Sequence, residues 1–121
     1  MVMVSLNNAR KKGRDAQRKS DLKQISTALE MYYDKYNGYP NDTFSGWESP
    51  CYTTTNDIGK LVTEEFLPKI PCDPGSNRYY FDPDGACAGG YCANYCIYTT
   101  LETTGGYYGI QNGGYTTCLG I

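Results

Sequence analysis

The sequence contains no histidine among its 121 residues. A Ser-His or Cys-His nucleophilic site, a side chain that exchanges protons near pH 7 and the commonest zinc ligand are therefore all missing. Neither glycine-rich phosphate motif, G-x-x-x-x-G-K-[ST] or G-x-G-x-x-G, occurs. We therefore predict a protein that binds or assembles and is not an enzyme, with no small-molecule substrate.

Long apolar segments are missing as well. The only apolar run near the N-terminus is Met1 to Val4 followed by Leu6, which is too short for a complete signal peptide. A formal net charge of only −2 and an aromatic content of 14% nevertheless favour a folded chain over a disordered one. We expect the 121 residues to form a single domain.

The first 50 residues lack cysteine, and six cysteines lie in the rest of the chain: Cys51, Cys72, Cys87, Cys92, Cys96 and Cys118. An even number in a small chain without histidine predicts three disulfides formed in an oxidising compartment. Zinc is the alternative, although the spacings among Cys87, Cys92 and Cys96 differ from the paired C-x-x-C of structural zinc sites. We expect Cys96–Cys118, which lie in or beside expected strands; proximity in sequence alone favours Cys51–Cys72 and Cys87–Cys92.

Proline is absent from residues 5–37, where apolar side chains recur at spacings of 3, 4, 3 and 4: Leu22, Ile25, Leu29, Tyr32 and Tyr36. This periodicity predicts a helix that buries one stripe. Asn37, Gly38 and Pro40 are typical of residues that end a helix. A helix of about 33 residues would be ~50 Å long, so we expect its first half to project from the domain.

The projecting half carries small residues on another face, about 160° from the apolar stripe: Ala9, Gly13, Ala16 and Ser20. Small side chains allow a partner helix to approach closely. Residues 1–23 also hold seven Lys/Arg against two Asp, a balance of +5, whereas the remaining residues sum to −7. We expect Arg10, Arg14 and Arg18, spaced four apart, to meet acidic groups of other copies. These arginines and the small residues form the predicted filament interface.

Three alternatives to an assembly surface remain open at this point. Residues 1–15 could be a frayed, solvated tail. Asp15 and Asp21 could pair with Lys11, Arg18 and Lys19 along the helix, giving a solvated charged face. The seven cations could instead contact nucleic-acid phosphates, an interpretation that the interrupting aspartates make less favourable. A secreted binding module acting alone would have no use for the long helix.

The rest of the chain predicts a short second helix and a sheet. Residues 57–66 place apolar side chains at helical spacing. The segments RYYFD, NYCIYTTLE and GYYGIQN are typical of short strands bounded by turn residues. We expect an α+β fold in which a long N-terminal helix packs on a small, disulfide-linked antiparallel sheet. Its parts are a helix at 1–37, a loop region with a short helix at 38–75, and a sheet with a C-terminal loop at 76–121.

The segment DPDG supplies the only metal hypothesis. Asp82 and Asp84 could give oxygen ligands to calcium, although two aspartates beside proline and glycine more often mark a turn. We therefore expect no cofactor, with calcium as the alternative at this segment.

Three segments resemble one known family: ARKKGRDAQRKSDLKQISTALEMYYDKYNGYP at residues 9–40, LVTEEFLPKIPCDP at 61–74, and the Tyr-rich region around YTTLE. They are similar to the type IV pilins and to the pseudopilins of type II secretion. The resemblance implies an N-terminal helix that is held in the membrane before assembly and later forms the filament core. Met1 to Leu6 resemble the end of that hydrophobic segment, and we expect the transmembrane half and its cleavage motif to be missing from this sequence.

The resemblance implies a structural subunit of a type IV pilus-like filament on the bacterial surface, with adhesion, motility or DNA uptake as its use. Its partners would be copies of itself and related pilins, and it would reach the membrane through the missing segment. A pseudopilin is the alternative, because Ile70 to Pro74 resemble the segment before the sheet of major pseudopilins, which often hold calcium in a sheet-region loop. The six cysteines and the Gly/Tyr-rich end favour a pilus exposed outside the cell.

Overall fold

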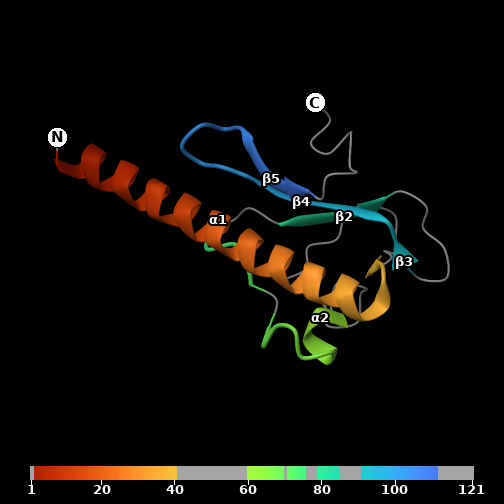
Figure 1. The fold of residues 1–121 in the computed structure, drawn as a ribbon. Helices are drawn as coiled ribbons and strands as arrows, with labels where there is room; N and C mark the ends of the chain where they lie inside the picture. The colour runs from red at the N-terminus through yellow and green to blue at the C-terminus, as the bar shows by residue number, and fades with distance from the viewer. Residues whose placement is uncertain (1, 41–59, 70, 76–78, 85–90, 112–121) are drawn as a thin grey trace.

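The computed structural model describes residues 2–40, 60–69, 71–75, 79–84 and 91–111 (Figure 1). Within these residues one long helix, α1 (Val2–Tyr36), packs on two small antiparallel sheets, so the predicted α+β class is confirmed. Figure 1 shows α1 lying across the sheets with its N-terminal end extending past them. No helix among the described residues combines the length and the apolarity that crossing a bilayer requires.

The C-terminus of α1 is fixed by a capping motif at Asn37. This residue adopts a positive φ of 57°, and its N–H donates to the Tyr33 carbonyl at 2.6 Å. Asparagine tolerates the left-handed conformation better than most residues, which suits it to the position just after a helix. The predicted end of the helix is therefore confirmed, and its mechanism is a left-handed cap.

The larger sheet contains β2 (Tyr80–Asp84), β4 (Asn94–Thr100) and β5 (Tyr107–Gln111) in the order β2-β4-β5. The register pairs Phe81 with Ile97 and Ile97 with Ile110. Each strand overlaps one predicted strand segment. Pro83 is accommodated because β2 is an edge strand among the described residues, where the missing N–H removes no ladder bond on the open side.

The smaller sheet was not predicted. It pairs β1 (Tyr39–Pro40) with β3 (Tyr91–Cys92). Two-residue strands show no alternation that a sequence could reveal. Gly38 is required here for space, because a Cβ on it would lie 2.7 Å from the Tyr91 Cβ.

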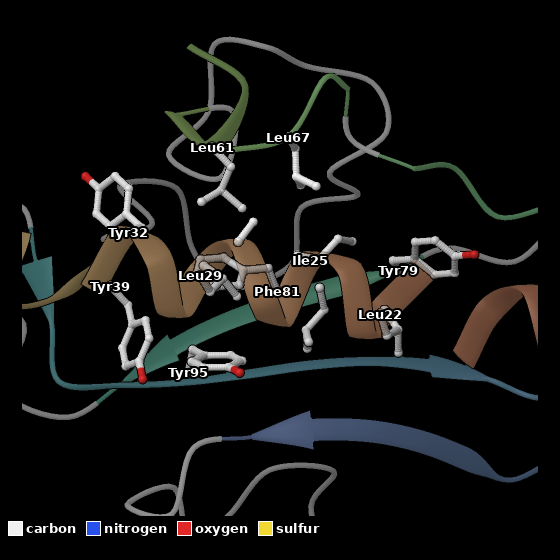
Figure 2. Close-up of a cluster of buried hydrophobic side chains, with 12 residues drawn as sticks. Leu22, Ile25, Leu29, Tyr32, Tyr39, Leu61, Leu67, Tyr79, Phe81 and Tyr95 are labelled. Carbon is white, nitrogen blue, oxygen red and sulfur yellow. The ribbon is translucent and has the colours of Figure 1, made fainter. Parts of the chain in front are cut away.

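The core lies between α1 and the sheets (Figure 2). Leu22, Ile25, Leu29 and Tyr32 are buried, as the apolar stripe predicts, and Tyr36 packs against the same cluster at partial burial. They meet buried side chains from the strands and from the segment after β1: Tyr39, Leu61, Leu67, Tyr79, Phe81, Tyr95 and Ile97. This packing fixes which face of α1 points away from the body.

The second helix, α2 (Lys60–Thr63), is shorter than the predicted 57–66. It ends in a reciprocal pair of bonds, from Phe66 N–H to the Leu61 carbonyl and from Glu65 N–H to the Val62 carbonyl, with Glu65 at φ 63°. This C-terminal motif stops the helix before Pro68. Leu61 is buried in the core, whereas residues 57–59 lie outside the described residues.

Candidate functional site

The predicted assembly surface lies on α1 where the helix leaves the body. All residues from 5 to 13 are exposed, and so are Ala16 and Ser20. Together with Ala9 and Gly13 they form the small-residue face, which is open to solvent in the single chain. A Cβ on Gly13 would meet nothing within 4 Å, so no contact inside the described chain requires glycine there.

Arg18 does not belong to this surface, and its assignment to the filament interface is wrong. Its side chain is only 1% exposed. Its guanidinium donates to three carboxylates: Nε to Asp73 at 2.5 Å, Nη1 to Asp15 at 2.8 Å, and Nη1 to Glu102 at 2.7 Å. A guanidinium enclosed by its own chain is not available to a neighbouring subunit.

Arg14 is also committed within the chain. Its Nε and Nη2 donate to the two carboxylate oxygens of Glu102 at 2.6 and 2.8 Å, a bidentate pair. The side chain is 34% exposed, so part of it still faces solvent. Of the three arginines predicted to meet other copies, only Arg10 remains fully exposed and without an ion pair to a described residue.

These residues form one partly buried charge network, here called the Arg18 cluster: Arg14, Asp15, Arg18, Asp73 and Glu102. Two guanidinium groups face three carboxylates in it. Asp73 and Glu102 lie 55 and 84 residues from Arg18 along the chain. The cluster therefore ties three distant segments together at the point where α1 leaves the body.

The hydrogen bonds of the cluster keep its members ionised. Burial raises the pKa of Asp15, but bonds from the Glu102 N–H, from the hydroxyl and N–H of Thr103, and from Arg18 outweigh it and hold this pKa well below its usual range. Arg14 and then Arg18 lower the pKa of Glu102 to about 2. The bond to Asp73 contributes most to raising the pKa of Arg18. All three groups are charged throughout the physiological range.

Asp21 extends the polar contacts one turn further along α1. It accepts from the Tyr79 hydroxyl at 2.6 Å and from the Gln17 amide at 2.7 Å. Burial contributes most to raising the pKa of Tyr79, and the hydrogen bond from its hydroxyl to Asp21 raises this pKa further. Asp21 is buried, so the interpretation of Asp15, Arg18 and Asp21 as a solvated charged face is wrong, although the Asp15–Arg18 pair that it contains is present.

A sequence signal for the cluster existed and was missed. Arg18 precedes Leu22 by four residues, and Arg14 precedes Arg18 by four, so both continue the apolar stripe toward the N-terminus. Charged residues on the buried face of a helix predict buried partners, which must come from elsewhere in the chain. Asp73 and Glu102 carry no comparable signal, because only the fold brings them to this face.

The remaining cations among residues 1–23 are exposed: Arg10, Lys11, Lys12, Lys19 and Lys23. None forms an ion pair with another residue in the described part of the chain. The Lys19 ammonium lies 5.4 Å from the centre of the Tyr108 ring. With Arg14 and Arg18 held by carboxylates, five of the seven predicted phosphate-binding cations are left for the nucleic-acid alternative.

Three of the six cysteines and both aspartates of DPDG lie in the described part of the chain. Cys72, Cys92 and Cys96 are disulfide-bonded and not free thiols. Cys51, Cys87 and Cys118 lie outside the described residues, so all three predicted pairings stay predictions. Asp82 and Asp84 lie in strand β2, opposite Cys96 and Asn94. They are therefore not in a turn, the structure that the sequence favoured over a calcium site for this segment. Among the described residues no group of three or more His, Cys, Asp or Glu is arranged to hold a metal ion.

Comparison with known proteins yields no match to a family, to a curated protein or to a solved structure.

Proposed function

We propose that this chain is a structural subunit of a type IV pilus-like filament on the bacterial surface, and that it assembles through the exposed part of α1. The proposal extends to a membrane anchor that precedes the described helix before assembly, and to disulfides that stiffen the exposed head. Related pilins and copies of this chain would be its partners.

One observation carries the proposal: α1 continues for residues that its own body does not cover. Residues 5–13 are exposed, although the helix includes them without a break. A helical segment as short as residues 5–13 is marginally stable in water on its own, so it is expected to be stabilised by a partner. The small-residue face, where a Cβ on Gly13 would meet nothing within 4 Å, is suited to a closely packed helix.

The Arg18 cluster gives this segment a defined direction. It anchors α1 by charge-assisted bonds just C-terminal to the exposed residues, at Arg14, Asp15 and Arg18. A subunit that adds to a filament needs its assembly helix held at one angle to its head. Arg14 and Arg18 would therefore serve the surface indirectly, by orienting it.

The test is the size of the side chain at position 16. We expect Ala16→Leu, introduced into the gene as the cell carries it, to abolish filaments visible by electron microscopy, because the larger side chain keeps the partner helix away. Ala16→Ser is the matched control, since it stays small, and it should assemble normally. Ala16 is exposed in the single chain, so circular dichroism of both variants should match the wild type.

Normal filament numbers in the Ala16→Leu strain would contradict the proposal. Loss of filaments in both variants would also contradict it, because the effect would then not depend on size.

A further inference from the structure

The exposed face of α1 carries a second pattern, in which charges are separated by sign. The face is formed by residues at spacings of 7, 4, 7 and 4, all exposed and all within a sector of about 60°: Lys12, Lys19, Lys23, Glu30 and Asp34. The first three are cations and the last two are anions. We call this set the charge stripe.

This arrangement is unfavourable for a single helix in water. Lys19 and Lys23 are like charges at i, i+4, and so are Glu30 and Asp34, a spacing at which like charges repel. Asp34 also lies in the last turn of α1, where the helix dipole disfavours a negative charge. A helix adapted only to solvent would alternate the two signs at this spacing. Separation by sign indicates a partner that carries the opposite charges.

The described chain does not supply that partner. Its ion pairs involve Arg14, Arg18 and Lys35, and none includes a member of the charge stripe. Within the described residues Lys19 contacts the Tyr108 ring, and Glu30 accepts from the Tyr39 hydroxyl at 2.9 Å. Neither contact neutralises a charge, so the stripe remains available to another molecule.

We propose that the partner is a second copy of this chain, parallel to the first and shifted by half the length of α1. A shift of about 16 residues, or ~25 Å, brings Lys12 and Lys19 of one copy close to Glu30 and Asp34 of the other. This contact rests on the proposed filament function and gives the register between neighbouring subunits. The exposed residues 5–13 then lie along the C-terminal half of the neighbour's helix.

An antiparallel pair would also match opposite charges, but it fits the rest of α1 less well. It would place residues 5–9 beyond the end of the neighbour's helix, so about half of the exposed segment would stay uncovered. A parallel shift leaves the second half of each stripe free to bind a further copy, and the contact repeats without closing. Exposed ion pairs are individually weak, so they set register and orientation within an assembly and depend on salt.

The test is zero-length carbodiimide cross-linking at millimolar protein and low salt, which joins an amine to a carboxylate only where the two touch. An equimolar mixture of ¹⁴N and ¹⁵N protein identifies links between copies by mass spectrometry. We expect links from Lys12 and Lys19 to Glu30 and Asp34 of another copy, and a ladder of products larger than dimers. High salt should remove them.

Charge reversal makes the test specific. Lys12→Glu/Lys19→Glu and Glu30→Lys/Asp34→Lys should each lose these links when alone, and a mixture of the two variants should recover them. Arg10→Glu/Lys11→Glu is the matched control, because it reverses two neighbouring charges on other faces of α1 and should leave the links intact. Circular dichroism checks that each variant is folded. The single variant Lys12→Glu serves where a double variant fails to fold, because it changes only an exposed residue outside the body.

Three results would overturn the register: links that persist in either variant alone, no recovery in the mixture, or products that stop at a dimer, as a closed antiparallel pair would give. The filament proposal is judged separately. Normal filaments in the Lys12→Glu/Lys19→Glu strain, with filaments lost in Ala16→Leu, would refute the register alone. Intact links in a protein whose wild-type strain forms no filament would refute the filament function alone.

Discussion

Replacing Arg18 by methionine is expected to lower the free energy of unfolding by about 3–5 kcal/mol, the usual loss when one member of a buried ion pair is removed. Methionine fills much of the same space, so the effect comes from charge and not from a cavity. Asp15 and Asp73 would lose the guanidinium that both contact, and they would remain in a buried site. Chemical denaturation followed by circular dichroism measures the change.

Arg14→Met is the matched control for this prediction. Arg14 contacts Glu102 in the same cluster, but a third of its side chain is exposed and water can replace its bonds. Its loss should be clearly smaller than that of Arg18→Met. Arg18→Lys should also destabilise strongly, because an ammonium cannot reproduce the forked contact with Asp73. Equal losses for the Arg14 and Arg18 variants would show that the cluster is not organised around Arg18.

Truncating Leu29 to alanine is expected to lower the free energy of unfolding by about 2–5 kcal/mol. Leu29 is fully buried, and Figure 2 places it at the centre of the core between α1, Leu61 and Phe81. The loss combines the transfer free energy of the removed carbons with the cavity that they leave.

Met31→Ala is the control for Leu29→Ala, since the residue lies on the same helix with 43% of its surface exposed. Alanine and methionine have similar helix propensities, so this variant should melt near the wild type. A melting temperature unchanged by Leu29→Ala would mean that the apolar stripe does not form the core.

Periodicity accounts for the parts of the fold that the sequence predicted. The spacing from Leu22 to Tyr36 defined α1 and its buried stripe, and three short segments bounded by turn residues became β2, β4 and β5. The β1–β3 pair is too short for any pattern, and α2 ends early because of a backbone motif at Glu65. Local patterns predict elements well only where the elements are long enough to repeat.

The sequence predicted only part of the candidate site, because a single sequence shows local patterns and not contacts between distant segments. The small-residue face was expected to be open, and Ala9, Gly13, Ala16 and Ser20 are exposed. Arg18 was misassigned because a charged residue was taken as a surface residue, although it and Arg14 continue the buried stripe. Their partners at positions 73 and 102 come from distant segments, and a single sequence does not show that the fold brings them together.

The Arg18 cluster and the exposed segment of α1 have complementary roles in this account. The cluster fixes the helix to the body through residues that lie far from α1 in the sequence, and residues 5–13, which precede the cluster, are exposed. The subunit is thus stable as a folded head while one surface stays incomplete. That surface is what a second copy would complete.

Amide hydrogen exchange, compared between the isolated chain and the assembled filament, tests this central claim most directly. In the isolated chain we expect residues 5–13 to exchange fast, because their helical bonds lack cover, and residues 22–32 to exchange slowly in the core. On assembly, protection of residues 5–13 should rise to the level of the core segment. Unchanged fast exchange of residues 5–13 in the filament, with new protection elsewhere on the chain, would contradict the account.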